Sequence, residues 1–493
     1  MSQDNTAYQR LSARFNQIAQ FEHLNALGDW DQATMMPPGG SEARAGAMAE
    51  LAKHIHQLKS DPQVGEWLEY AQDETLTSTE QANLREMQYH YGQATVVPSD
   101  LVEAKTKQAY ACEHAWREQR ANNDWQGFAP NLKKVISLVR EEAQIRGEQQ
   151  QLSPYDALLQ KFEPGMDSQR ISDIFNQVKS WLPQLISQIR AKQQSQASIV
   201  IPPYSADSQA KLGRAVMSLL GFDFNHGRLD ISSHPFCGGS SSDIRLTTRF
   251  DESDFTSGLM GIIHETGHAR YEQGLPIEWR GQPAGQYRSM AIHESQSLFF
   301  EMQMARGSGF LSLLAPLLKQ HLGSELSLAQ LQQIYSRVEP GFIRVDADEV
   351  TYPCHIMLRF EAEQAMVNGE LTVDDLPDFW DQHMQQLLGL STKGNDKMGC
   401  MQDIHWPVGE LGYFPSYSLG AMYAAQFKHS IEAQLGDIDS LVSAGKLNDI
   451  CAWLQQNIWS KGALLTTDEL VKHATGESLN PDHFKHHLQQ RYL

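Results

Sequence analysis

The chain has 493 residues and carries 60 acidic against 40 basic side chains, which gives a formal net charge of −20. An excess of negative charge of this size repels phosphate backbones and excludes a general nucleic-acid binder. No apolar run approaches the length of about 18 residues that a membrane span needs, and the N-terminus lacks the apolar stretch of a secretion signal. The five cysteines are dispersed and odd in number, so we expect a protein of a reducing compartment, the cytoplasm, that contacts no membrane.

Apolar residues recur at helical spacing over most of the chain. Two stripes, at residues 48–58 and 132–143, are typical of amphipathic helices that pack on a shared core. A third stripe at 171–189 contains Pro183, which lacks an amide hydrogen and should kink or break the helix. Helices are therefore predicted along most of the sequence.

The segment from 228 to 250 has a different pattern. Its turn-rich stretch 237–242 precedes alternating apolar residues, which predicts a hairpin or a small sheet. The short apolar run 198–201 is either a strand or a boundary before the next helix. Near the C-terminus, residues 480–481 predict the N-cap and first turn of a last helix.

Length alone suggests several domains, but no linker or change of composition divides the chain. We therefore expect a mainly α fold: a single domain over residues 1–493, with a large helical body and a small β element around 228–250.

The most informative motif is HETGH at residues 264–268. Residues four apart share one face of a helix, so His264 and His268 can offer two imidazoles to one metal ion while Glu265 lies beside a metal-bound water. This layout is typical of zinc metallopeptidases. The alternative is a pair of surface histidines that happen to have helical spacing.

A catalytic zinc needs a third protein ligand and one open position for water. Downstream candidates are Glu272, Glu278, Glu294 and Glu301. Glu294 is best placed, because its helix-like stretch can return antiparallel to the first helix and point a carboxylate at both imidazoles. His293 is a rival, but neighbours on a helix diverge by about 100 degrees, so His293 and Glu294 are not expected to bind the same ion. A solvated charge or a core ion pair is the alternative role for Glu294.

These residues resemble the thermostable, or Taq-type, metallocarboxypeptidase family, and the resemblance extends beyond the metal motif. The matching blocks are HPF at 234–236, DIRLT at 243–247, HETGH at 264–268, HESQ at 293–296, IRVDAD at 343–348, GCMQDIHW at 399–406 and GYFPSY at 412–417. The resemblance implies a mostly helical fold with a deep substrate groove, a homodimer, and release of C-terminal amino acids from peptides with broad side-chain tolerance.

The resemblance also implies roles for individual residues. It assigns Glu294 as the third metal ligand and Glu265 as the general base acting on a metal-activated water. One divalent ion per chain is expected, with Zn²⁺ first and Co²⁺ as the alternative. Arg344 is expected to bind the free carboxylate of a peptide substrate through two parallel hydrogen bonds, although a salt bridge to Asp346 or Asp348 is its structural alternative.

The remaining site residues rest on the resemblance more than on spacing. His405 and Tyr417 are expected to donate hydrogen bonds near the reacting carbonyl or the terminal carboxylate; a core histidine and a buried tyrosine are the alternatives. His234 and Arg245 belong to the β region, where a strand edge could align an extended peptide substrate. Asp403 is expected to orient His405 or a metal-binding histidine.

Two other functions fit parts of this pattern. A helical zinc oligopeptidase would cut internally or trim from the N-terminus, but the arginine in the matched blocks suits a carboxylate. A non-catalytic zinc-binding or peptide-binding protein would have no use for Glu265, because a structural metal site needs no general base.

Overall fold

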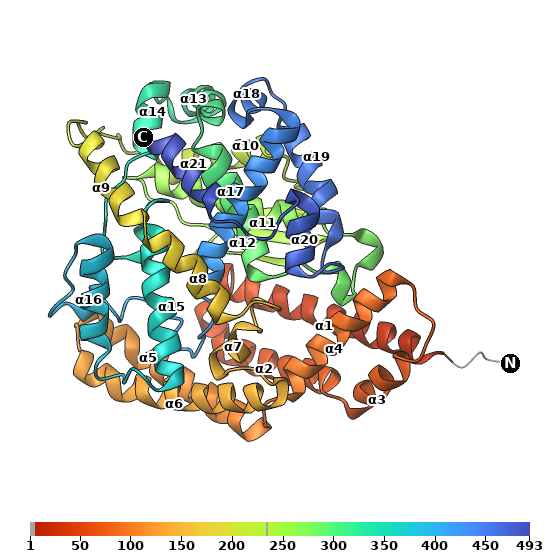
Figure 1. The fold of residues 1–493 in the computed structure, drawn as a ribbon. Helices are drawn as coiled ribbons and strands as arrows, with labels where there is room; N and C mark the ends of the chain where they lie inside the picture. Colours follow the sequence, from red (N-terminus) through yellow and green to blue (C-terminus); the bar gives the residue numbers. More distant parts are fainter. Residues whose placement is uncertain (1–4, 233–234) are drawn as a thin grey trace.

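The computed structural model describes residues 5–232 and 235–493. Helices dominate these residues, and one three-stranded sheet lies among them (Figure 1). The expected mainly α fold is therefore confirmed. No helix in the described ranges combines the length and the apolar character that a membrane span requires.

The N-terminal helices surround a small hydrophobic cluster of their own. Capping boxes at Thr6 and Thr77 satisfy the first amides of two of these helices. The cluster includes Leu11, Val64 and Met87, which are fully buried. The four helices are α1 (Ala7–Thr34), α2 (Ser41–Lys59), α3 (Pro62–Ala71) and α4 (Ser78–Thr95).

The main hydrophobic core lies among the other helices. The stripe at 132–143 is buried on α6, and Pro183 stands in the first turn of α9, so the chain breaks before it as predicted. The helices of this part are α5 (Ser99–Ala121), α6 (Trp125–Gln150), α7 (Pro154–Leu159), α8 (Ser168–Lys179), α9 (Leu182–Gln193), α10 (Ala206–Leu219), α11 (Phe255–Gly274), α12 (Met290–Leu298), α13 (Ser308–Leu322), α14 (Leu328–Tyr335), α15 (Tyr352–Asn368), α16 (Leu376–Leu388), α17 (Pro415–Leu435), α18 (Ile438–Ser443), α19 (Leu447–Asn457), α20 (Thr467–Thr475) and α21 (Asp482–Tyr492).

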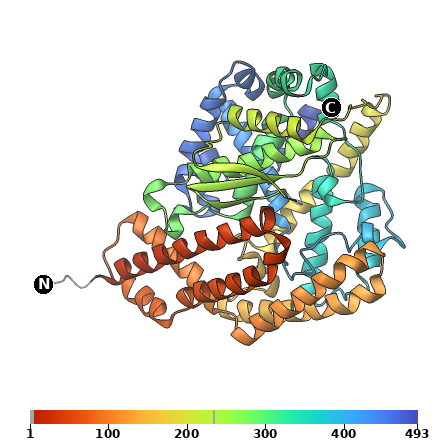
Figure 2. The same ribbon diagram turned by 180° about the vertical axis from the view of Figure 1, so that it is seen from behind.

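The predicted β element is a mixed sheet with the strand order β1-β3-β2. Its strands are β1 (Gly227–Ile231), β2 (Cys237–Ser240) and β3 (Asp243–Thr248); β1 is parallel to β3, and β2 and β3 form the hairpin. Ile244 and Leu246 of β3 are buried against α11, as the alternation predicted. On its other side the sheet meets α1 (Figure 2). There the Trp30 indole donates to Asp230 at 3.1 Å.

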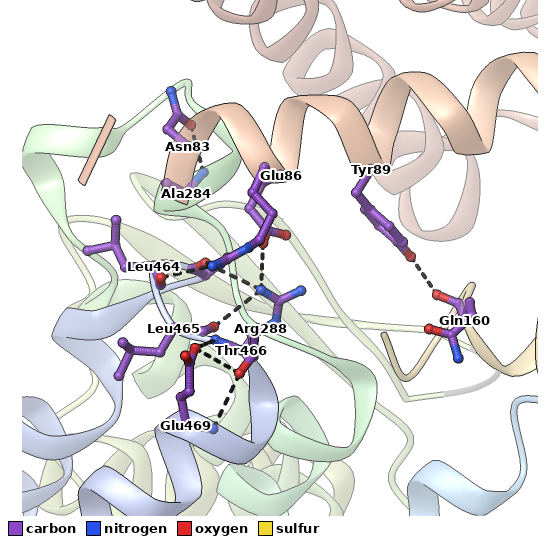
Figure 3. Close-up of polar contacts among 12 residues, drawn as sticks. Asn83, Glu86, Tyr89, Gln160, Ala284, Arg288, Leu464, Leu465, Thr466 and Glu469 are labelled. Atoms are coloured by element: carbon purple, nitrogen blue, oxygen red, sulfur yellow. Dashed lines mark hydrogen bonds and ion pairs between the residues drawn. The ribbon is translucent and has the colours of Figure 1, made fainter. Parts of the chain in front are cut away.

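Polar contacts join the N-terminal helices to the rest of the chain. Figure 3 shows Arg288 between the carboxylate of Glu86 on α4, at 2.8 Å, and the carbonyl of Leu465, at 3.3 Å. Asn83 accepts from the Ala284 amide at 3.1 Å. Arg288 and Glu86 are both buried, so this junction includes a desolvated ion pair.

Two local predictions are refined by the structure. Residues 198–201 form no strand, so the boundary interpretation is right. The last helix begins at Asp482 with Pro481 in the cap position, and Asn480 stands one position farther out. The Asn480 side chain still accepts from the Asp482 amide at 3.0 Å, so it satisfies one of the free amides at the helix start.

Candidate active site

The motif at 264–268 lies on α11, whose first amides are capped by Asp254 and which ends at Gly274. This helix packs against α12, which carries Glu294. Gly267 makes the close approach possible, because a Cβ atom there would stand 2.6 Å from the Gln296 carbonyl oxygen. The expected pairing of two helices is therefore present.

The structure brings His264, His268 and Glu294 together. One ligand atom from each lies within 4.8 Å of the others, and no second group of this kind occurs in residues 5–232 and 235–493. The Glu294 carboxylate is 3.9 Å from His264 Nε2 and 3.5 Å from His268 Nε2. Two imidazole nitrogens and a carboxylate oxygen form a donor set that suits a catalytic divalent cation.

The other ring nitrogen of each histidine is hydrogen-bonded. His264 Nδ1 lies 2.9 Å from Glu301 Oε2, and His268 Nδ1 lies 3.1 Å from the His293 carbonyl oxygen. These hydrogen bonds favour the tautomer that carries its proton on Nδ1, so the Nε2 atom of each ring is free to bind a metal ion. The three residues therefore fit a metal ion in both composition and orientation.

A third helix supports the Glu294 side chain from behind. Gly420 of α17 contacts it so closely that a Cβ atom there would stand 2.8 Å from Glu294 Cβ. Glu163, which is buried, fixes the start of α12 by accepting from the Ala291 amide at 2.5 Å. It also accepts from the Ser416 hydroxyl near the start of α17 at 2.8 Å, so one carboxylate ties α12 to α17.

Glu265 is buried next to the three candidate ligands. Burial raises the pKa of its carboxyl to about 7, and His264 opposes this rise. A carboxylate with a pKa in this range can accept a proton near neutral pH and pass it on. Its position beside His264 and Glu294 suits the predicted role of general base.

Three of the rival candidates for the third ligand position, Glu272, His293 and Glu301, have other partners, and Glu278 is exposed. His293 does not belong to the group of candidate metal ligands. Its Nε2 lies 3.0 Å from Glu272, and its ring stacks on the ring of His268. Glu301 points at the far side of His264, where it orients the ring. Sequence reasoning named Glu301 only as a possible ligand and missed this orienting contact.

Arg344 is buried and already has a carboxylate partner, but the predicted alternative partner was wrong. Asp348 accepts from backbone amides, while Arg344 Nε donates to Asp403 at 2.9 Å and Nη1 donates to the Tyr352 hydroxyl at 2.8 Å. Arg359 also pairs with Asp403, through Nε at 2.7 Å. Two guanidinium groups share one carboxylate, so the cluster keeps a positive charge, and Arg344 interacts electrostatically with the candidate ligand Glu294.

This arrangement corrects the expected role of Asp403. It pairs with Arg344 and Arg359 and makes no hydrogen bond to His405 or to either candidate metal-binding histidine among the described contacts. The two arginines hold the pKa of the Asp403 carboxyl well below its usual value, despite the opposing effect of burial. Arg359 was missed, although a cation in the apolar stretch of α15 was its sequence signal.

Tyr417 and His405 lie together next to Arg344. The Tyr417 hydroxyl is 3.4 Å from His405 Nε2, and the Arg344 guanidinium stands 5.1 Å from the centre of the Tyr417 ring. Burial lowers the pKa of His405 to about 4, so its imidazole is neutral at neutral pH. His405 Nδ1 is buried and has no hydrogen-bond partner among the described residues.

Of the two residues predicted in the β region, the structure describes Arg245. Arg245 makes a two-pronged ion pair with Asp243 of the same strand, at 2.8 and 2.7 Å. His234 lies outside the described residues. Near this strand, a cavity of about 560 Å³ opens between α1, the β2–β3 turn and the end of α11, and Glu272 forms part of its wall.

Comparison with known proteins agrees with the geometry. Residues 10–492 match the family model described as carboxypeptidase Taq (M32) metallopeptidase. The chain is 37% identical to thermostable carboxypeptidase 1 of Thermus thermophilus, over 99% of this chain and 98% of that protein. It is 33% identical to carboxypeptidase 1 of Bacillus subtilis, over 96% of each.

Two solved structures have the same fold. Metallocarboxypeptidase 1 of Trypanosoma cruzi superposes with a TM-score of 0.96 at 42% identity, over 99% of both chains. The carboxypeptidase of Pyrococcus furiosus superposes with a TM-score of 0.95 at 30% identity, also over 99% of both chains. The chain belongs to the carboxypeptidase Taq (M32) family of metallopeptidases.

Proposed function

We propose that this metallocarboxypeptidase removes single residues from the C-terminus of peptides, with a zinc ion held by His264, His268 and Glu294. The observation that carries the proposal is the convergence of these three ligand atoms within 4.8 Å, with His264 Nε2 at 3.9 Å and His268 Nε2 at 3.5 Å from the Glu294 carboxylate. These residues would hold a divalent cation, which when bound would supply a Lewis acid for a water molecule and for the scissile carbonyl. Cobalt remains the alternative ion, because this donor set accepts several divalent metals.

The proton transfers fall to Glu265. Its carboxylate takes a proton from the attacking water and delivers it to the nitrogen of the departing amino acid. Burial favours the protonated form that this second step requires, and the ionised form is still accessible because its pKa is about 7. The same side chain can therefore serve as base and acid in one turnover.

Recognition of the free carboxylate falls to Arg344. The second arginine, Arg359, offsets the charge of Asp403, so Arg344 can attract an anion although it is already hydrogen-bonded. Tyr417 and His405 lie close enough to donate to the terminal carboxylate or to the reacting carbonyl. We keep His234 as a substrate-binding proposal on the resemblance alone.

We further propose that residues 1–493 form one catalytic domain, that the enzyme is a homodimer, and that it acts in the cytoplasm. Five free cysteines are consistent with a reducing compartment. Light scattering coupled to size-exclusion chromatography tests the dimer, since a mass near twice 55.5 kDa is expected.

Mass spectrometry of digests tests the proposed reaction. A peptide with a free C-terminus should lose residues stepwise, whereas its C-terminally amidated twin should stay intact, because the guanidinium of Arg344 requires a carboxylate. Glu265→Gln should keep its metal and lose about 10²–10⁴-fold in turnover. Internal cleavage of both peptides would instead support the oligopeptidase alternative.

Arg344→Ala provides a second arm of this experiment. The substitution should raise KM for the free peptide, and the preference for free over amidated ends should shrink by at least tenfold. Equal losses of activity on both peptides would reject the proposal that Arg344 binds the terminal carboxylate. The proposed metal chemistry would be unaffected by this result.

A further inference from the structure

The π-helical turn η4 (Phe299–Ala305), which continues α12, needs hydrogen-bond donors at its C-terminal end. In a regular ladder, the carbonyls of Met302 and Gln303 would accept from amides of residues 306–308. Those amides bond elsewhere: the first two reach the Met304 carbonyl, and the third reaches the Asp439 carboxylate. The two carbonyls therefore depend on another part of the chain.

Arg491 of α21 supplies those donors. Its guanidinium donates to the Met302 carbonyl and, at 3.0 Å, to the Gln303 carbonyl. A cation at this end also faces the negative pole of the helix dipole. Arg491 thus acts as the C-terminal cap of a turn that is remote in sequence.

A buried carboxylate anchors α21 in this position. Glu349 accepts from the Tyr492 hydroxyl at 2.8 Å and lies 2.6 Å from His487 Nε2 and 3.3 Å from Arg491 Nη1. Glu349 stands in the loop that follows Arg344. Helix α21 therefore contacts both η4 and the loop that follows Arg344.

From η4 the connection continues to the metal site. Glu301 uses one carboxylate oxygen for His264 Nδ1, at 2.9 Å, and the other for Arg306 Nη2, at 2.7 Å. Although burial opposes it, Glu301, Tyr492 and Glu349 raise the pKa of Arg306, so this guanidinium is charged between the two carboxylates. The path from α21 to His264 therefore consists of the hydrogen bonds from Arg491 to η4, the backbone of η4, and the hydrogen bond between Glu301 and His264.

We propose that α21 is a positioning element of the metal site: Arg491 caps η4 and thereby fixes the direction from which Glu301 orients His264. The inference rests on the proposed metal site. Arg491 is a positioning residue, because it touches neither the candidate ligands nor the expected position of the substrate.

The test compares metal affinity in two variants of the full chain. Arg491→Met removes the cap, and Lys485→Met removes a positive charge from the same helix, where Lys485 contacts only the Trp181 ring among the described interactions. The dissociation constant for Zn²⁺ of each apoprotein is measured by competition with a coloured chelator. We expect Arg491→Met to weaken Zn²⁺ binding about tenfold, the lower end of the range for residues that support a metal ligand through a hydrogen bond. Lys485→Met should bind Zn²⁺ as tightly as the wild type.

The visible spectrum of the Co²⁺-loaded proteins gives a second readout, because it reports ligand geometry rather than stability. It should change in Arg491→Met and not in Lys485→Met. Should Arg491→Met fail to fold, Arg491→Lys keeps the charge and offers a single point donor in place of the fork. It should show a smaller change in the same direction, and wild-type affinity and spectrum in Arg491→Lys would then overturn the proposal.

A measurement on the unaltered protein completes the test. Coupling between two sites is reciprocal, so metal loading should slow hydrogen exchange of the amides in α21 and η4, and not in the neighbouring α20. Equal hydrogen-exchange rates of the α21 amides with and without metal would contradict the inference. A separate variant shows whether the proposed metal site itself is wrong. In that case His264→Ala would bind Zn²⁺ as tightly as the wild type.

Discussion

Glu301 shows how one carboxylate can serve two buried groups. Its oxygens contact His264 Nδ1 and the Arg306 guanidinium, so the negative charge is shared between an imidazole and a cation. A negative acceptor behind a histidine ligand makes the imidazole more basic and fixes its ring. Glu301 therefore belongs to the surroundings of the candidate metal site although it provides no candidate ligand atom.

We predict that Glu301→Gln weakens metal binding by about 10- to 100-fold, because a neutral amide neither raises the basicity of His264 nor balances Arg306. Chelator competition on the apoprotein measures the change. Glu272→Gln is the matched control, since Glu272 pairs with His293, which provides no candidate ligand atom. Equal losses in both variants would show that any buried carboxylate here affects the metal in the same way.

Single residues also show where sequence reasoning succeeded and where it stopped. His264 and His268 were predicted because their contact is local, four residues apart on one helix. The partner of Arg344 was predicted wrongly because spacing reveals only near neighbours such as Asp348, whereas Asp403 comes from a distant loop. Long-range pairs of this kind depend on tertiary packing, which periodicity does not encode.

At the scale of elements, the site depends on how closely three helices approach one another. Gly267 of α11 lies against the backbone of α12, and Gly420 of α17 lies against Glu294. Neither contact leaves room for a methyl group. The sequence predicted α11, α12 and the direction of α12, but it could not predict the π-helical turn η4, whose last carbonyls accept from Arg491 of the distant helix α21.

Gly267→Ala is expected to push α11 away from α12. Its Cβ would stand 2.6 Å from both the Gln296 carbonyl oxygen and Ser297 Cα, and backbone atoms cannot move aside as a flexible side chain can. We expect a loss of stability of about 1–3 kcal/mol, the usual cost of overpacking, and weaker metal binding. Thermal unfolding and chelator competition measure the two effects.

Gly261→Ala is the control, because it lies on the same helix and a Cβ there meets no atom within 4 Å. Removing a helix-interior glycine at such a position should stabilise the protein by about 0.5–1 kcal/mol. If Gly261→Ala also destabilised the protein, an added methyl group would be unfavourable elsewhere on α11 too. The effect of Gly267→Ala could then not be attributed to the close approach of α12.

At the scale of the whole molecule, the charge of −20 contrasts with a site that must receive an anion. The structure places Arg344 and Arg359 around a single carboxylate, Asp403, and brings Arg344 within electrostatic reach of Glu294. A dication bound by one carboxylate would add to this local excess of positive charge. The overall charge therefore says little about the substrate, because buried groups determine the field that the substrate meets.

The number of domains is a second property of the whole molecule. The N-terminal helices have a hydrophobic cluster of their own, yet a buried ion pair between Arg288 and Glu86 joins α4 to the segment leading into α12. If residues 1–493 form a single cooperative domain, as we propose, this junction must be strong enough for both parts to unfold together.

Arg288→Met tests that condition, because it removes the buried partner of Glu86 and leaves this carboxylate paired with Arg85, whose side chain is 40% exposed, at a cost of up to about 3 kcal/mol. We expect one calorimetric transition in the wild type and, in the variant, an earlier separate transition of the N-terminal helices. Arg117→Met is the control: it breaks an exposed pair with Glu113 within α5, worth at most about 1 kcal/mol, and should keep a single transition. Two transitions already present in the wild type would mean that α1 to α4 fold as an independent domain.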